Sequence, residues 1–237
     1  MDITENLIAR LAIAKTMSRP RVEDLSPATL AVNPSILLVK EGNASLEPFR
    51  ANQVDTNLEW YFDEESVLSV GLFYKDIESF IYTGVELEPL VVDGEDVIDP
   101  LTNSVMNLQH DRPINGDGGS VWGYELNLQH SFDSGFGTAI NYTFVDTDAE
   151  FTNTITGDVF GVPGLSEDSF NATVYYETEK WSARVSYNYR SEFLSKVAGV
   201  GSNPIFTKEY GQYDISTSYN VNDDIVLRFD AINLTGE

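Results

Sequence analysis

The residues with the greatest potential for chemistry are carboxylates gathered in one stretch, residues 85–119. This stretch has a single base, Arg112, and eight acids: Glu86, Glu88, Asp93, Glu95, Asp96, Asp99, Asp111 and Asp117. Clustered carboxylate oxygens are the ligands that Ca²⁺ prefers, but the spacing in "DGEDVID" (93–99) does not match an EF-hand loop. A solvated acidic loop explains the same residues, so we predict no metal site.

The other residue types used in catalysis are scarce. There is no cysteine, and the two histidines are His110, in the acidic stretch, and His130, which alternates in phase with Leu128 and Phe132. A hydrolase on the surface of a strand requires Ser and His together, and the sequence shows no such pair. "GDGGSVWG" (116–123) also lacks the Lys of a phosphate-binding loop. We therefore predict a protein that is not an enzyme and has no cofactor.

The overall charge excludes one class of partner. The chain of 237 residues has 14 Lys and Arg against 38 Asp and Glu, a formal charge of −24. Nucleic acid would be repelled by such a surface, so we expect none as a partner. No stretch approaches 18 uninterrupted apolar residues, which argues against a helical membrane span. The N-terminus "MDITENLIAR" lacks the features of a signal peptide, which favours a cytoplasmic protein or a piece of a longer one.

Period-two alternation of apolar and polar residues runs through most of the chain. In "KWSARVSYNYRSEF" (180–193), Trp181, Val185 and Tyr187 share one face, and Arg184 and Ser186 share the other. This pattern is typical of strands, and no segment has the period of an amphipathic helix. The sequence predicts an all-β fold with nine strands, in this stretch and in residues 7–14, 56–62, 67–74, 121–132, 138–145, 169–177, 213–221 and 225–234.

The connections between these strands alternate between short and long. Four are tight: "DEES" (63–66), "DSGFG" (133–137), "TEK" (178–180) and "NDD" (222–224). The long ones cover roughly residues 19–55, 83–120, 146–168 and 194–210. Short periplasmic turns and long extracellular loops are typical of outer-membrane barrels, whereas Greek-key sandwiches do not sort loops by end. The pattern favours an antiparallel up-and-down transmembrane barrel.

Aromatic residues on the apolar faces support this interpretation. Trp122 and Phe132 lie ten residues apart, which is roughly 33 Å along a strand and roughly 25 Å across a membrane at a tilt of about 40°. Aromatics at both ends of an apolar band are typical of the membrane interfaces, although they are also good strand formers. The polar faces suit a hydrated lumen. The predicted girdle comprises Trp60, Trp122, Tyr124, Phe132, Tyr142, Phe144, Trp181, Tyr187 and Tyr189.

One long phrase of the sequence resembles a known family. "SLEPFRANQVDTNLEWYFDEESVLSVGLFYKDIESFI" (45–81), "TMSRPRVEDLSP" (16–27), Asn33-Pro34 and "DAINLTGE" (230–237) are similar to TonB-dependent receptors of Gram-negative bacteria, in particular the group associated with oligosaccharide uptake. The resemblance implies a 22-stranded barrel around an N-terminal plug. It also implies localisation in the cell outer membrane, and TonB as the partner that drives transport.

The chain departs from that family in several respects. Neither the plug nor the TonB box is present, nine is an odd number of strands, and the sequence stops before a closing strand. The sequence therefore predicts that residues 1–237 are a partial barrel of about nine strands. Its expected partners are outer-membrane lipid, the remainder of the receptor, TonB through the N-terminal part, and an extracellular small solute.

The ligand is predicted from the resemblance and from charge. The stretch 85–119 has a formal charge of 1 − 8 = −7, which repels anionic ferric siderophores but not neutral sugars. An oligosaccharide is the expected solute; the alternatives are a ferric-siderophore receptor, a soluble extracellular carbohydrate-binding β protein and a small self-closing porin. The expected ligand contacts near the loop mouths, which could equally pack their own loops, are Phe80, Tyr82, Phe151, Asn153, Phe160, Phe193, Phe206 and Tyr210.

Overall fold

The computed structural model describes residues 2–33, 37–152, 157–196 and 203–236, and all secondary structure there consists of strands. The all-β prediction is confirmed. No helix in this described part of the chain is long and apolar enough to cross a membrane.

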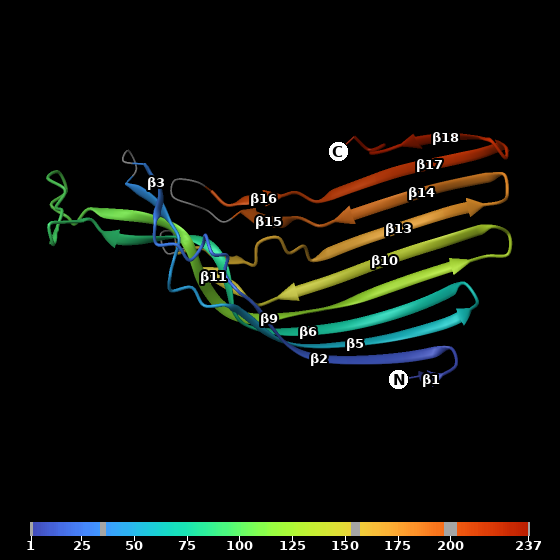
Figure 1. The fold of residues 1–237 in the computed structure, drawn as a ribbon, viewed down its shortest axis with the longest axis horizontal. Helices are drawn as coiled ribbons and strands as arrows, with labels where there is room; N and C mark the ends of the chain where they lie inside the picture. The colour runs from blue at the N-terminus through green and yellow to red at the C-terminus, as the bar shows by residue number, and fades with distance from the viewer. Residues whose placement is uncertain (1, 34–36, 153–156, 197–202, 237) are drawn as a thin grey trace.

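One twelve-stranded sheet organises the molecule (Figure 1). Ten strands form an antiparallel path in the order of the chain, each paired with its neighbours in that order. The other two, β3 (Thr29–Asn33) and β4 (Leu38–Glu41), pair with each other, and β4 also pairs in parallel with β9. All nine predicted strands are present, and a short strand, β1, precedes them. The strands are β1 (Asp2–Thr4), β2 (Leu7–Ser18), β5 (Phe49–Asp63), β6 (Ser66–Pro89), β9 (Asn107–Ser131), β10 (Phe136–Thr147), β13 (Asp168–Glu177), β14 (Trp181–Arg190), β17 (Tyr210–Asn222) and β18 (Ile225–Ala231).

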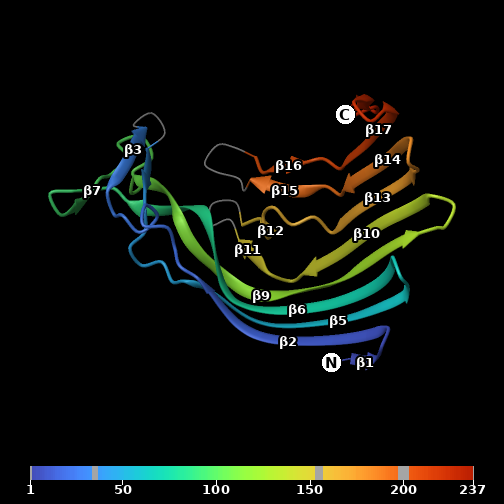
Figure 2. The same ribbon diagram turned by 45° about the vertical axis from the view of Figure 1, so that its right-hand side comes forward.

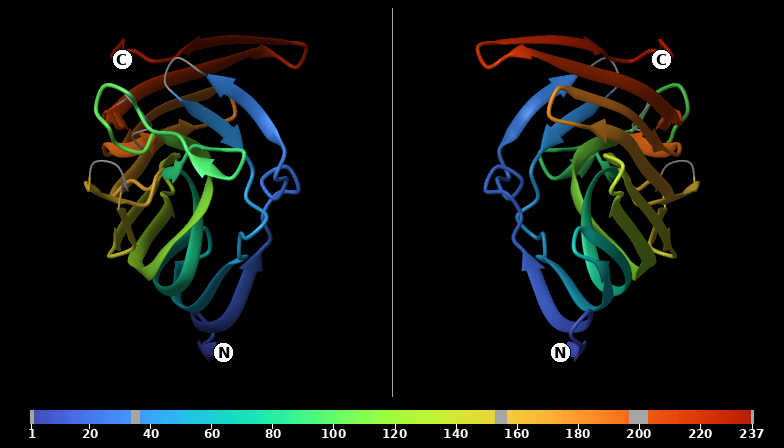
Figure 3. Two further views of the ribbon diagram at one scale, coloured as in Figure 1. Left: turned by 90° about the vertical axis from the view of Figure 1, so that its left-hand side faces the viewer. Right: turned by 90° about the vertical axis from the view of Figure 1, so that its right-hand side faces the viewer.

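The two ends of this sheet differ, as the loop lengths predict. At one end, the turn end, tight connections join β5 to β6, β9 to β10, β13 to β14 and β17 to β18. At the other, the loop end, the connections contain short strands of their own: β3 (Thr29–Asn33), β4 (Leu38–Glu41), β7 (Val91–Val92), β8 (Glu95–Asp96), β11 (Glu150–Thr152), β12 (Val159–Gly161), β15 (Phe193–Lys196) and β16 (Ile205–Thr207). The sheet curves into a trough from β2 to β18 (Figures 2 and 3).

The expected loop over residues 83–120 is wrong. Strands β6 and β9 keep one register from Val67↔Gln129 to Pro89↔Asn107, with Glu78 and Gly118 left out of the pairing, so most of the acidic stretch forms a long hairpin. Figure 1 shows this hairpin extending beyond the other strands. Pro113 has no N–H to donate to a neighbouring strand. This is tolerated because the pairing of β9 with β10 ends at Val121, so β10 does not need a hydrogen bond from residue 113. Pro113, Gly116, Gly118 and Gly119 therefore lie inside a strand, whereas Gly94 and Pro100 lie in turns at the tip of the hairpin.

The two faces of the sheet have opposite character. One face is apolar and uncovered: the exposed fractions are 67% for Leu11, 76% for Ile13 and 57% for Leu72. Across strands, Val185 pairs with Val174 and Ile215 on this face, while its neighbour Ser186 pairs with Thr173 and Asp214 on the other. A water-soluble sandwich would cover the apolar face, so the arrangement suits a sheet that is surrounded by lipid.

The buried core lies at the loop end. Ala51, Ile77, Phe80, Ala149 and Leu194 form its one cluster of buried apolar residues, and Phe49, Val121, Phe160 and Val162 pack against it. Ala149 approaches so closely that a Cβ on Gly119 would lie 2.4 Å from its Cα. The loops that carry Ala149 and Leu194 are therefore folded onto the sheet.

Aromatic rings cover glycines on neighbouring strands. Phe73 lies opposite Gly123, and Tyr175 lies opposite Gly137. A Cβ on Gly123 would come within 2.5 Å of the Phe73 ring, and one on Gly137 within 2.2 Å of the Tyr175 ring. These cross-strand pairs fill the space that the missing side chains leave, which is a recognised way to fix register in curved sheets.

Candidate functional site

The predicted girdle residues fall at two levels of the strands. Trp60, Phe132 and Trp181 lie at the turn end and are about half exposed, and Trp181 stacks on Tyr219 with ring centroids 4.5 Å apart. Trp122, Tyr124, Tyr142, Phe144, Tyr187 and Tyr189 lie toward the loop end. There the Phe144 ring is 5.6 Å from Trp122 and 5.4 Å from Tyr124. The two levels are separated by apolar side chains such as Leu126 and Leu128, and the place of these aromatics at the membrane interfaces stays a prediction.

The structure contains a Ser–His pair that the sequence analysis did not find. The Oγ of Ser66 lies 2.6 Å from the Nδ1 of His130, and the His130 ring is 4.1 Å from the Phe132 ring and 5.3 Å from the Phe62 ring. Ser66 is only 3% exposed. The pair ties the β5–β6 turn to β9 at the turn end. A hydroxyl this enclosed cannot meet a substrate, so the pair does not suggest a nucleophile.

The polar face of the sheet is lined by side chains that hydrogen-bond along and across strands. Asn57 donates to Glu59 at 2.9 Å, and Glu59 also forms an ion pair with Arg10. Elsewhere on this face, the hydroxyls of Thr173 and Ser186 are 2.9 Å apart. A wall of short polar groups suits the polar interior of a barrel.

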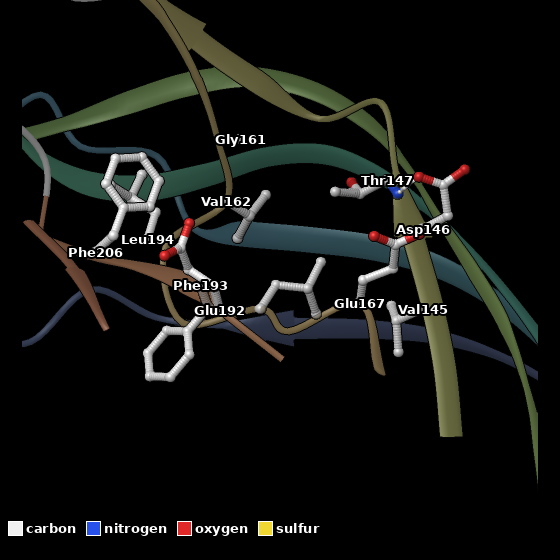
Figure 4. A pocket seen from close by; sticks show the side chains of 11 residues that line it. Val145, Asp146, Thr147, Gly161, Val162, Glu167, Glu192, Phe193, Leu194 and Phe206 are labelled. Carbon is white, nitrogen blue, oxygen red and sulfur yellow. Dashed lines mark hydrogen bonds between the residues drawn. The ribbon is translucent and has the colours of Figure 1, made fainter. Parts of the chain in front are cut away.

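A cavity of about 280 Å³ opens at the loop end of this face (Figure 4). It lies where the end of β10, the segment after β12 and the β15–β16 hairpin meet. Figure 4 shows Phe206, Leu194 and Val162 toward one end, with Asp146, Thr147 and Glu167 at the other. Glu192 lies on the side of Leu194. The lining comprises Val145, Asp146, Thr147, Gly161, Val162, Leu165, Glu167, Glu192, Phe193, Leu194 and Phe206.

Hydrogen bonds from Arg190 connect the segments that form this cavity. The Arg190 guanidinium donates to the Ser166 hydroxyl and to the Gly164 carbonyl, both at 2.6 Å, and stacks 4.0 Å from the centre of the Phe193 ring. Ser166 in turn donates to the Ser191 carbonyl at 3.1 Å. These contacts join the segment after β12 to the end of β14. The cavity is thus built by packing between two loops.

The predicted ligand contacts divide into several groups. Phe193 and Phe206 line the cavity, and Phe160 lies just before its lining residues Gly161 and Val162. Phe151 is paired with Phe160 in the backbone register of β11 and β12. Asn153 lies outside the described residues.

The remaining predicted contacts are elsewhere. Phe80 is 6% exposed and belongs to the core cluster, where it packs with residues of other segments. Its role as a ligand contact stays a prediction. Tyr210 begins β17 on the polar face, is 39% exposed and donates its hydroxyl to Gln212.

Glu167 and Glu192 line the cavity but were not among the predicted contacts. Glu167 could have been found from the run 146–168, which contains six acids and no Lys or Arg.

Tyr82 borders a second, more polar cavity of about 380 Å³, next to the long hairpin. Burial, and then the charges of Glu86 and Asp117, raise the pKa of the Tyr82 hydroxyl. Two amides near this cavity bind backbone: Asn43 donates to the Pro113 carbonyl at 3.1 Å and Asn115 to the Glu47 carbonyl at 3.1 Å. These amides therefore fasten the loop before β5 to the hairpin.

The acidic stretch is organised around its one arginine. Arg112 donates to Glu86 and to Glu88, each at 2.6 Å, and to Glu41 of β4 at 3.2 Å. Glu41 also lies 2.8 Å from the Nδ1 of His110. Partial burial lowers the pKa of the Arg112 guanidinium, but Glu86 and Glu88 outweigh it and the net pKa is raised. The expectation of a solvated loop is therefore wrong for this part.

Among the described residues there is no group of three His, Cys, Asp or Glu placed to hold a metal ion.

Comparison with protein families identifies the chain. The family model described as the β-barrel of TonB-dependent receptors matches residues 2–234. The chain belongs to this family. Its members are outer-membrane proteins of Gram-negative bacteria, so the localisation and the partial-barrel prediction are confirmed. The turn end is then periplasmic and the loop end extracellular.

Solved structures with a similar fold include siderophore receptors. The ferric enterobactin receptor PfeA of Pseudomonas aeruginosa, in a mutant form, superposes with a TM-score of 0.68 at 18% identity over 99% of this chain and 33% of its own. The siderophore receptor PirA of Acinetobacter baumannii superposes with a TM-score of 0.65 at 17% identity, over 99% of this chain and 35% of its own. The ferric-catecholate import receptor Fiu of Escherichia coli K12 superposes with a TM-score of 0.64 at 20% identity, over 100% of this chain and 30% of its own.

These values show a shared fold and a difference in length. At identities of 17–20%, the likeness concerns the barrel wall rather than the ligand. The chain spans about a third of the length of these receptors. A comparison with curated proteins finds no match.

Proposed function

We propose that the chain forms part of the barrel wall and several outer loops of an outer-membrane receptor for active uptake of a scarce solute, and that the solute is an oligosaccharide. The observation that carries this proposal is the cavity at the extracellular end of the polar face. It combines a half-exposed ring, Phe206, with the hydroxyl of Thr147 and the carboxylates of Glu167 and Glu192. An apolar surface with a few polar groups is the usual composition of a small-molecule site.

The partners follow from the family. The remaining strands would pair with the sheet edges at β1–β2 and β18, because unpaired backbone groups are costly in lipid. The plug would lie inside the closed barrel. TonB would act through the N-terminal part of the receptor and supply the energy for release. The role proposed for this segment is binding and passage of the solute, without catalysis and without a cofactor.

The charge of the outer surface supports a neutral or cationic solute over an anionic one. The run 146–168 has six acids and no Lys or Arg, and the stretch 85–119 has a formal charge of 1 − 8 = −7. Such a field repels anions at the mouth of the barrel, whereas it leaves neutral sugars unaffected.

A ferric siderophore is the second candidate. It is favoured by the names of the similar solved structures, which are receptors for ferric enterobactin and other siderophores.

Uptake by the intact receptor tests both candidates. The receptor that contains this chain would be produced in the outer membrane of a Gram-negative host, and uptake of labelled neutral oligosaccharides and ferric siderophores would be compared at low salt. Sugar uptake that stops when TonB is deleted is the expected result. Tight binding and TonB-dependent uptake of a siderophore, with no measurable sugar binding, would refute the oligosaccharide and leave the barrel assignment intact.

A further inference from the structure

The cavity of Figure 4 has a chemical character that narrows the class of solute beyond "oligosaccharide". Its volume of about 280 Å³ lies at the lower limit of ligand sites, which run from about 300 to 1,000 Å³. Such a space admits one ring-sized unit of a longer ligand.

Carboxylates border the cavity on two sides. Glu192 lies on the side of Leu194 and Phe206, and Glu167 lies at the opposite end beside Thr147 (Figure 4). The third carboxylate, Asp146, accepts the backbone N–H of Thr147 at 2.9 Å. Val162 and Leu165 supply apolar surface along the cavity. A unit held there thus meets a negative charge toward each end and an apolar wall beside it.

One base lies beside the cavity. Arg190 has its guanidinium hydrogen-bonded to the neutral groups of Ser166 and Gly164 and stacked on Phe193, so it keeps its positive charge there. No Lys, Arg or His is among the described residues that line the cavity. The three lining carboxylates and Arg190 together give a formal charge of 1 − 3 = −2, which a cationic ligand would complement.

We propose that this cavity is a subsite for a sugar unit that carries a protonated amino group, so that the solute is a cationic amino-sugar oligosaccharide. This inference rests on the proposed function. Hydrogen bonds from an ammonium group to a carboxylate are about twice as strong as neutral ones. The C–H face of the sugar ring packs on Phe206.

Three oligomers of equal length provide the test: a glucosamine oligomer, its N-acetylated form and a glucose oligomer. Binding to the intact receptor in outer-membrane vesicles would be measured by calorimetry at low salt and at a pH where the amines are protonated. We expect the amine form to bind at least about tenfold more tightly than the acetylated form, because acetylation removes the positive charge and keeps the ring.

Variants locate this preference. The double variant Glu167→Gln, Glu192→Gln is expected to lower affinity for the amine form to that of the acetylated form. Glu150→Gln removes one charge from the same loop, outside the cavity lining, and is expected to keep the preference. Phe206→Ala is expected to weaken all three oligomers by a similar factor. Unchanged heat-modifiable mobility of each variant in detergent gels would show that the barrel is folded.

The outcomes separate this inference from the proposed function. Equal binding of the amine and acetylated forms, or a preference that survives the double variant, would overturn the amino-sugar subsite while sugar uptake still supported the receptor assignment. Binding of a ferric siderophore alone, with none of the three oligomers bound, would overturn both. A preference lost in the double variant and kept in Glu150→Gln would support both.

Discussion

The membrane belt, which is the part of the sheet between the turns and the level of Tyr74 and Trp122, differs from the loop end in where its apolar side chains point. In the belt, Ile13 is 76% exposed and Val174 is 55% exposed. At the loop end, Ala149 is fully buried and Ala51 is 2% exposed. The same strands thus expose apolar side chains in the belt, where lipid must cover them, and bury apolar side chains within the chain at the loop end.

This difference shows that burial within the chain is a poor guide to stability here. The belt depends on the backbone ladder and on lipid, because only a sheet without unpaired groups is stable in hydrocarbon. The loop end depends on side-chain packing and ion pairs, as a water-soluble domain does. Substitutions should therefore follow different rules in the two regions.

The largest expected effect is in the belt. In the intact receptor, Val185→Arg should cost about 2–4 kcal/mol of unfolding free energy, which is the penalty for Arg on the lipid face near the bilayer midplane. Ser186→Arg, on the polar face one residue away, should cost much less. Urea unfolding in lipid vesicles would measure both. Equal costs, or the reverse order, would contradict the assignment of the faces.

A packing change should matter at the loop end. Gly119→Ala places a Cβ 2.4 Å from the Cα of Ala149, and overpacking of this kind costs about 1–3 kcal/mol. Gly161→Ala is the matched control, since a Cβ there meets no atom within 4 Å. Faster proteolysis of the 146–168 loop in the first variant only is expected. Similar proteolysis of the two would show that the loop is not packed against the sheet.

The ion network of the hairpin should have a smaller effect. Arg112→Met leaves three carboxylates near one another, and we expect a loss of about 1–2 kcal/mol, reduced by solvent because Glu86 and Glu88 are partly exposed. The loss should be local, with faster hydrogen exchange in β4. Arg21→Met, at a pair where both side chains are mostly exposed, should leave exchange unchanged. Unaltered protection of β4 in Arg112→Met would exclude this role.

The smallest effect concerns acid pH. The backbone N–H of Ser120, followed by its hydroxyl, lowers the pKa of Asp148. A lowered pKa in the folded state stabilises the contact above the ordinary Asp pKa, and this contribution is lost as the pH falls through the folded value. Hydrogen-exchange protection at Ser120, corrected for intrinsic rate, should therefore decrease on acidification. In Asp148→Asn this decrease should vanish, and its persistence would implicate another group.

The belt could be predicted from the sequence because alternation there serves one physical requirement, with lipid on one side and water on the other. Val185 and Ser186 are assigned to their faces by parity alone. The loop end obeys no such period. Pro113 and Gly116 favour a turn locally, yet they continue a strand because β6 stays paired beside them. Glu167 and Glu192 border the same cavity although they belong to two separate loops, which no local pattern reveals.

The constant register of β6 and β9 has a mechanical consequence. The same two strands run from the turn end to a tip beyond the other strands, and β4 pairs with β9 at residues 109–111, so the hairpin is joined to the barrel wall. A small rotation of β6 and β9 in the barrel wall would be magnified at residues 90–106. A spin label or fluorophore at Leu101, which is 92% exposed, would then report movements of the wall from outside the cell.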